Sequence, residues 1–191
     1  MSVGMEAFIE EAIATCDYVK AQDRSSKKMM LAFDEWNVWF HSNEDDRKIE
    51  PWSIALPQLE DVYSFEDVLV VSCMLISLIK HADRVKIGCV AQLVNVIAPI
   101  MTPNGGGIHR QTIFYPYLHA STYGRRIALD LKIKSSTYED SIFGQVPYLE
   151  SVAVWNPEAE KLTIFAVNRN LDQGVSLIGD LRDFEDYRII S

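Results

Sequence analysis

The residues with the clearest capacity for chemistry are an acidic pair, Asp34 and Glu35, and the polar and aromatic residues directly after it. A carboxylate can act as a nucleophile or as a general acid or base. Trp36 and Trp39 offer flat apolar surface and Asn37 offers an amide, which are the groups that a sugar-binding site needs. The plainer alternative is that the acidic pair ends a strand at the surface and the tryptophans belong to the core.

A buried strand is predicted to carry the acidic pair. Residues 29–33 form a short continuous apolar run, which is typical of a strand covered on both faces in a parallel sheet. Successive side chains on a strand point to opposite faces, so only one of Asp34 and Glu35 can enter a site. A helix with apolar spacing over residues 8–19 precedes this strand, and a polar, acidic loop over residues 40–61 follows it. Loops of that length usually serve a site or are disordered, so from the residues alone the acidic pair lies either beside a site or at a surface strand end.

A second strand is predicted further along the chain. Ser64 and Asp67 have the spacing of a capping box, which predicts a helix from Ser64 through His81. Residues 85–96 form another apolar run, which contains Gln92. Strand, helix and strand together predict a parallel βαβ unit. From the residues alone, Gln92 is either a polar residue that closes a buried strand or an amide that binds a ligand.

The pattern of the sequence changes after Gly124. A short helix is predicted over residues 115–123, with Pro116 in its first turn and Gly124 at its C-terminal cap. Residues 149–155 and 162–167 are β-rich runs around a six-residue polar turn, which predicts an antiparallel hairpin. Two further apolar runs, residues 175–178 and 187–190, are candidate strands. The fold class predicted is therefore α/β followed by all-β.

Composition limits the kind of partner. The chain has 191 residues, a formal net charge of −9 and a pI near 4.9. Because this charge repels phosphate, nucleic acid and anionic membrane surfaces are not expected as partners. The N-terminus lacks a basic segment followed by an apolar run, and the most apolar stretch, residues 68–79, is too short to cross a bilayer. We therefore predict a cytoplasmic protein.

The cysteines and histidines do not predict a cofactor. Their spacing fits neither a metal site nor a disulfide framework, and the apolar setting of the cysteines favours buried thiols in a reducing compartment. These residues are Cys16, Cys73 and Cys89, and His41, His81, His109 and His119. The glycine run at residues 105–107 lacks the lysine and hydroxyl residue of a phosphate-binding loop. We predict no metal and no cofactor.

Several separate motifs resemble the family 51 α-L-arabinofuranosidases. They are FDEWNVWFHS at residues 33–42, IEPW at 49–52, FED at 65–67, KHADRV at 80–85, AQLVNVIAPI at 91–100 and PYLESV at 147–152. The motifs occur in the family's order and cover almost the whole chain. The resemblance implies the C-terminal portion of a (β/α)₈ TIM barrel over residues 1–124, followed by an incomplete jelly-roll-type β-sandwich over residues 125–191.

The resemblance also implies an activity, the hydrolysis of terminal non-reducing α-L-arabinofuranosyl residues in arabinan, arabinoxylan or arabino-oligosaccharides with retained configuration. It implies that Glu35 is the catalytic nucleophile, that Gln92 binds sugar hydroxyls, and that Trp39 forms the wall of the site near the leaving group. Family members are usually hexamers, so a homo-oligomer is expected.

One part of the family pattern is missing. Retaining hydrolysis needs a second carboxyl about 5–5.5 Å from the nucleophile, and the family supplies it from an Asn-Glu pair on an earlier barrel strand. The only Asn-Glu pair here is Asn43-Glu44, in the polar loop, where Glu44, Asp45, Asp46 and Glu50 are expected to be solvated charges and not a substitute acid. With two predicted strands instead of eight, the chain is expected to be inactive alone. The alternatives are a catalytically inactive carbohydrate-binding protein and an oligomerisation fragment.

Overall fold

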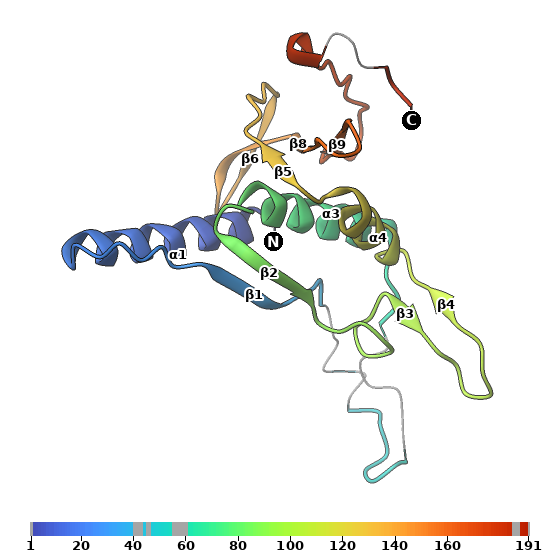
Figure 1. Cartoon of the computed structure of the whole chain (residues 1–191). Coiled ribbons are helices and arrows are strands. Elements are labelled where there is room, and N and C mark those ends of the chain that lie inside the picture. The colour runs from blue at the N-terminus through green and yellow to red at the C-terminus, as the bar shows by residue number, and fades with distance from the viewer. Residues whose placement is uncertain (1, 40–43, 45–46, 55–60, 185–187, 191) are drawn as a thin grey trace.

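The chain consists of a long first helix, a parallel strand pair with helices beside it, and a set of antiparallel strands (Figure 1). The computed structural model describes all residues except 1, 40–43, 45–46, 55–60, 185–187 and 191. Helix α1, Ser2–Gln22, buries Met5 and Ile9. It confirms the helix predicted over residues 8–19 and extends it at both ends.

The predicted parallel βαβ unit is confirmed. Strand β1 (Leu31–Trp36) pairs in parallel with strand β2 (Val85–Val90), and helix α3 (Phe65–Lys80) connects them. The helix begins at the predicted capping box. Asp67 N donates to Ser64 Oγ at 3.4 Å, and Ser64 N donates to Asp67 Oδ2 at 2.6 Å.

One face of the strand pair carries the larger core. Its buried side chains come from α1, α3, both strands and the segments beside them: Met5, Ile9, Trp36, Val38, Tyr63, Val71, Met74, Leu75, Val85 and Ile113. On the opposite face Ala32 and Ile87, which are partners in the ladder, are exposed. The prediction that residues 29–33 are covered on both faces is therefore wrong for this chain, because α1 and α3 lie on the same side of the strands (Figure 1).

Strand β2 ends at Val90, earlier than the predicted end at residue 96. Ala91 N still donates to Trp36 O at 3.0 Å, but the chain then turns and meets the next element through a bridge between Val94 and Ile100. The apolar run continues beyond the strand through Leu93 and Val94, which are exposed, and into residues 95–97, which are partly buried, so hydrophobicity did not mark the strand end.

A small hairpin and a short helix follow the turn. Strand β3 (Ile100–Met101) pairs antiparallel with β4 (His109–Arg110), and residues 105–107 connect them with positive φ at each glycine. Helix α4 (Phe114–Tyr123) confirms the predicted helix and its cap. A Cβ atom on Gly124 would lie 2.5 Å from the carbonyl oxygen four residues earlier, so only glycine fits there.

The last part of the described chain is rich in strands. They are β5 (Ile127–Leu129), β6 (Thr137–Asp140), β7 (Gly144–Pro147), β8 (Leu149–Asn156) and β9 (Lys161–Asn168). Strands β5, β8 and β9 form an antiparallel sheet in that order, and β6 pairs with β7. The β8–β9 hairpin is confirmed, but its turn has four residues, 157–160, because Asn156 and Lys161 still pair in the ladder.

Helix α3 lies between the parallel pair and this sheet (Figure 1). Cys73 and Ile76 of α3 pack against Val152 of β8 and Val167 of β9 in a second core. Glu150 of β8 is only 4% exposed and forms ion pairs with Lys80 of α3 and, at 2.5 Å, with Arg169. The sheet is thus joined to the helix by apolar packing and by paired charges.

Two expectations about the C-terminal residues are not met. Residues 175–178, all of which are described, form no strand; they follow turns in which Asn168 and Asn170 accept from the backbone two residues on. Of the candidate strand at residues 187–190, Tyr187 lies outside the described residues and the other three are not in a strand. Within the described ranges, none of the helices has the length and apolar character needed to span a membrane.

The three cysteines differ in environment. Cys73 is buried as predicted, and burial raises the pKa of its thiol. Cys16 is partly buried, whereas Cys89 on β2 is exposed, so the prediction of a buried thiol is wrong there. The reason is the open face of the strand pair, because Gly88 beside it faces Leu78 of α3 and alternation turns Cys89 to the other side.

Candidate active site

Glu35 lies at the carboxyl end of β1, next to the carboxyl end of β2. The ladder pairs Phe33 with Gly88 and Trp36 with Val90, so β1 uses one more residue than β2 over this stretch. Such a register shift is what a β-bulge produces, and it changes the direction of the side chains within it. Phe33 and Trp36 pack in the same core although two residues separate them, so strict alternation does not hold across Asp34 and Glu35, which are both exposed.

Trp36 and Asn37 have structural partners instead of open surface. Trp36 is 5% exposed and stacks on Tyr117 with 6.2 Å between ring centroids, so for this residue the core interpretation is correct. Asn37 Nδ2 donates to Ala91 O at 2.9 Å and to Ile97 O at 2.5 Å. The amide that was expected to bind sugar hydroxyls therefore binds the backbone after β2.

Trp39 and Gln92 lie near the same strand ends as Glu35. Trp39 follows β1 by three residues and is 56% exposed. Gln92 follows β2 by two residues and is also exposed, and its peptide bond with Ala91 is cis. The structure thus brings Glu35, Trp39 and Gln92 to one end of the strand pair, and their roles in binding and catalysis stay predictions.

Two buried polar residues that the sequence did not reveal support this end of the strands. Tyr63 Oη donates to Val38 O at 3.0 Å, and Tyr63 N donates to Gln111 Oε1 at 3.1 Å. Gln111 Nε2 in turn donates to the carbonyls of Asp61 and Ala98, at 2.9 and 2.8 Å. The position of Tyr63 before a helix cap is one where apolar residues often pack, which predicts burial but not these bonds. Gln111 carries no local signal.

Burial has a chemical consequence for Tyr63. Loss of solvent around the hydroxyl raises the pKa of Tyr63, and the nearby carboxylates of Asp61 and Asp67 raise it further. The phenol therefore stays protonated and remains a hydrogen-bond donor to Val38 at any ordinary pH. This makes Tyr63 a support for the chain after β1 and not a proton-transfer group.

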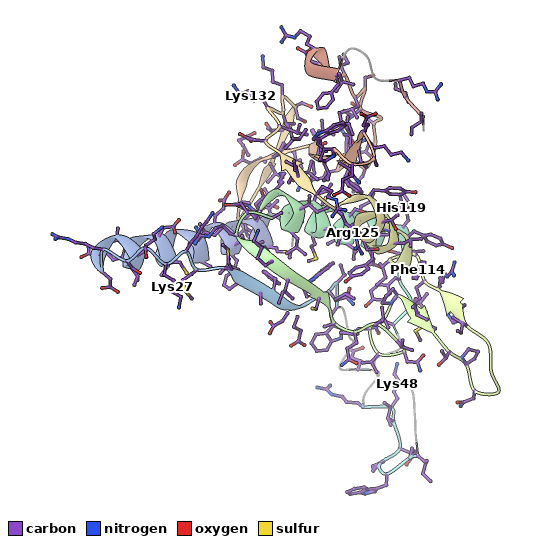
Figure 2. The ribbon with its side chains drawn as sticks, in the orientation of Figure 1. Lys27, Lys48, Phe114, His119, Arg125 and Lys132 are labelled. Carbon is purple, nitrogen blue, oxygen red and sulfur yellow. The ribbon has the colours of Figure 1, made fainter. Side chains whose placement is uncertain are left out.

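The loop after β1 adds exposed side chains. Its described part includes Lys48, which Figure 2 shows on a segment extending away from the strands. Trp52 is 99% exposed there, and Glu44 and Glu50 are exposed residues. Asp45 and Asp46 lie outside the described residues.

Two hollows lie away from Glu35. A cavity of about 1080 Å³ is lined by charged residues of α1, among them Asp17 and Lys20, and by the turn before β2. A smaller one of about 340 Å³ lies between α3, α4 and β9 and includes His119, which is labelled in Figure 2. Glu35 lines neither of these two hollows, which are formed by other elements of the described chain.

One cluster has the side chains of a metal site. Ligand atoms of Glu6, Glu10 and His81 lie within 4.8 Å of one another. However, Lys80 Nζ lies 3.4 Å from Glu6 Oε1, and Ser77 Oγ donates to Glu6 Oε2 at 2.8 Å. An ammonium group beside the carboxylate opposes a second cation, so we interpret this cluster as an ion-pair contact between α1 and α3.

The chain resembles known proteins along most of its length. Residues 34–191 match the family model of the alpha-L-arabinofuranosidase C-terminal domain. The chain is 58% identical over 189 residues to the intracellular exo-alpha-(1->5)-L-arabinofuranosidase of Halalkalibacterium halodurans, covering 99% of this chain and 38% of that protein. It is 56% identical over 188 residues to the intracellular exo-alpha-(1->5)-L-arabinofuranosidase 1 of Bacillus subtilis, covering 98% of this chain and 37% of that protein. It thus spans less than two fifths of the length of these relatives.

Solved structures show the same relationship. A family 51 alpha-L-arabinofuranosidase from Bifidobacterium longum superposes with a TM-score of 0.82 at 34% identity, over 90% of this chain and 36% of that one. The GH51 arabinofuranosidase of Xanthomonas axonopodis pv. citri, with a TM-score of 0.70 at 24% identity over 88% of this chain and 31% of that one, supports the fold alone. A mixed α/β chain with these neighbours fits a barrel-plus-sandwich enzyme. The resemblance seen in the sequence motifs is confirmed, and the chain belongs to the α-L-arabinofuranosidase C-terminal domain family.

Proposed function

We propose that this chain carries the nucleophile of a retaining α-L-arabinofuranosidase that removes terminal non-reducing α-L-arabinofuranosyl residues. The observation that supports this most directly is the position of Glu35, which is exposed at the carboxyl end of one parallel strand and beside the carboxyl end of the next. Barrel enzymes carry their catalytic groups at this end of the strands. The family membership of the chain gives the class of substrate.

In the proposed reaction the Glu35 carboxylate attacks the anomeric carbon of the arabinofuranosyl unit and displaces the aglycone. The covalent glycosyl-enzyme is then hydrolysed by water, so the configuration is retained. Gln92 binds the sugar hydroxyls from the neighbouring strand end, and Trp39 forms the wall near the leaving group. The chain has no Asn-Glu pair on an apolar strand, so the acid/base carboxyl comes from another part of the enzyme.

The proposed substrates are arabinan, arabinoxylan and arabino-oligosaccharides. These sugars are neutral, so the net charge of −9 does not oppose their binding. The names of two relatives describe exo cleavage, of α-(1->5) linkages in Halalkalibacterium halodurans and of α-(1->6) linkages in a Bifidobacterium longum protein that is 43% identical. From the word intracellular in the first name we propose a cytoplasmic location, and from the family resemblance a hexamer.

The proposed function includes a proposed architecture. Residues 1–124 would complete the end of a (β/α)₈ barrel, and residues 125–191 would begin a jelly-roll-type β-sandwich. The parallel pair with helices on one face supports the first part, because barrel strands have helices outside and packed side chains inside. The antiparallel strands from β5 onward support the second part.

A second candidate is a sugar-binding chain without catalysis. The exposure of Trp39 and Gln92 at open strand ends favours it for the chain taken alone. The two candidates differ in whether Glu35 is required once a complete barrel surrounds it.

The first test uses the 191-residue chain and its Glu35→Gln variant with an aryl α-L-arabinofuranoside. We expect no hydrolysis by the chain above that of the variant, because one carboxylate cannot be both the nucleophile and the acid/base. Turnover that is lost in the variant would show that another carboxylate of this chain acts as the acid.

The second test joins this chain to the N-terminal part of the Halalkalibacterium halodurans relative, replacing the matching residues of that protein. We expect this chimera to hydrolyse the aryl arabinofuranoside with retained configuration. NMR identifies which anomer of arabinose is released first and so measures the retention. Glu35→Gln should reduce turnover to background, whereas Glu158→Gln, on the exposed β8–β9 turn, should leave it unchanged. A folded chimera that binds arabinose without Glu35-dependent turnover would favour the sugar-binding candidate.

A further inference from the structure

The segment between β2 and β3, residues 91–99, carries Gln92 but has little regular structure. Two of its residues have a left-handed backbone, Asn95 at a φ of +65° and Ile97 at +40°. Asparagine tolerates this conformation, but a β-branched residue such as isoleucine is disfavoured there. Contacts with the rest of the fold must therefore hold the segment in place.

The Asn37 side chain bonds this segment close to Gln92, where Ala91 N also donates to Trp36 O at 3.0 Å. The Nδ2 group of Asn37 donates to Ala91 O at 2.9 Å and to Ile97 O at 2.5 Å, on either side of Gln92 in the chain. Carbonyl oxygens only accept hydrogen bonds, so the amide nitrogen must face them and both of its hydrogens are in use. Asn37 Oδ1 accepts from Val38 N at 2.8 Å, which fixes the amide from the other side.

We propose that Asn37 is a positioning residue, which holds Gln92 in place relative to Glu35 by bonding the backbone at both ends of residues 91–97. This inference rests on the proposed function, in which Glu35 and Gln92 contact the same sugar. Asn37 is two residues after Glu35, and Ala91, which it bonds, directly precedes Gln92. A shift of this backbone therefore moves Gln92 with respect to Glu35.

Other residues hold the same segment at a distance from Gln92. The Asn95 side chain bonds to the backbone and hydroxyl of Thr102, and Gln111 Nε2 donates to Ala98 O. These contacts fix the far end of the segment and remain when Asn37 is changed. Loss of the Asn37 amide should therefore loosen residues 91–97 locally without unfolding the protein.

The test in the active chimera is a double-mutant cycle. Asn37→Asp keeps the shape but removes the donors, and Asn37→Ala removes the amide without adding charge. Each should lower kcat/KM for the aryl arabinofuranoside by about a hundredfold, mainly through kcat, because misplaced binding groups act on the transition state. Asn156→Asp, the same change at the β8–β9 turn, should have no effect, since Asn156 uses only its Oδ1 acceptor.

Coupling to Gln92 separates positioning from general structural support. If Asn37 acts through Gln92, then Gln92→Ala should cost much less in the Asn37→Ala background than in the parent chimera. The proposal would be overturned if the factors by which the two single substitutions lower kcat/KM simply multiply in the double mutant. It would also be overturned if Asn37→Ala had the kinetics of the parent. Urea midpoints of all variants show whether each one is folded.

A second measurement does not depend on catalysis. In the 191-residue chain, Asn37→Ala should increase hydrogen exchange at Ala91 N, Asn95 N and Val96 N, whose bonds to Trp36 O, Ile100 O and Val94 O close the segment. Unchanged protection of these amides would also overturn the proposal. An inactive parent chimera, or one that is active without Glu35, would instead reject the proposed function. The hydrogen-exchange result would still show whether Asn37 holds residues 91–97 in place.

Discussion

At the scale of single residues, Tyr63 shows how a buried side chain supports a site without taking part in chemistry. Its hydroxyl donates to Val38 O at 3.0 Å beside the end of β1. Tyr63→Phe removes this donor and leaves a buried carbonyl unpaired, which should lower the free energy of unfolding by about 1–2 kcal/mol in urea titrations. Tyr138→Phe, in the β6 strand, is the matched control and should change the midpoint much less.

The same residue predicts a dependence of stability on pH. Burial, with help from Asp61 and Asp67, raises the pKa of Tyr63 in the folded state. In the unfolded chain a tyrosine ionises near pH ~10, so above that pH the unfolded state loses a proton that the folded state keeps. Its contribution to stability is therefore present below about pH 10 and is lost as pH rises. The urea midpoint should fall more steeply above pH 10 in the parent than in Tyr63→Phe, and equal slopes would contradict this.

The motif around Glu35 shows which residue-scale properties the sequence predicts. The position of Glu35 at a strand end followed from the apolar run before it, which is a local signal. The burial of Trp36 and the backbone bonds of Asn37 did not, because their partners, Tyr117, Ala91 and Ile97, are more than 50 residues away in the chain. The register shift at residues 34–35 also depends on the neighbouring strand, so alternation alone gave the wrong picture.

At the scale of elements, the start of α3 depends on one cap. Ser64 Oγ accepts from Asp67 N, and Asp67 accepts from Ser64 N. Ser64→Ala should reduce the free energy of unfolding by about 1 kcal/mol, because a helix N–H loses its acceptor. Ser176→Ala, at an exposed residue without helix or strand structure, is the control and should be neutral. Equal midpoints for the two variants would show that the cap contributes nothing measurable.

A buried charge joins α3 to the antiparallel sheet. Glu150 on β8 pairs with Lys80 of α3 and with Arg169 after β9. Glu150→Ala removes this partner from Arg169, whose side chain is only 10% exposed, and from Lys80, which still pairs with Glu6, and we expect a loss of about 3 kcal/mol in urea unfolding. Glu158→Ala breaks an exposed pair with Arg126 and should lose well under about 1 kcal/mol. Similar losses for the two glutamates would mean that burial of the Glu150 network adds no stability.

The elements that the sequence predicted correctly are those with local end signals. The capping box fixed the start of α3, Gly124 fixed the end of α4, and polar residues marked the β8–β9 hairpin. Element ends that depend on distant partners were predicted poorly. Strand β2 stops at Val90, where Asn37 bonds the following backbone, and residues 175–178 have the composition of a strand but form none.

At the scale of the whole molecule, the fold has one covered and one open face on its parallel strands. The helices cover the face that contains Trp36 and Val85, whereas Ala32, Ile87 and Cys89 are exposed on the other. Exposure of a strand face with apolar side chains such as Ile87 to water is unfavourable. In a (β/α)₈ barrel that face is the packed interior. The chain spans only 38% of its Halalkalibacterium halodurans relative, so we expect the rest of such a protein to cover this face.

Cys89 provides a measurement of that closure. In the 191-residue chain its exposed thiol should react with an aromatic disulfide reagent faster than Cys73, which is buried and whose raised pKa leaves little thiolate. Cys89→Ser should remove this fast reaction and identify its source. In the chimera with the N-terminal part of the relative, the barrel interior should enclose Cys89, so its labelling should slow by at least about tenfold, since the reagent must then wait for the structure to open. A rate equal to that of the chain alone would mean that the open strand face is not a barrel interior, and the proposed architecture of residues 1–124 would be wrong.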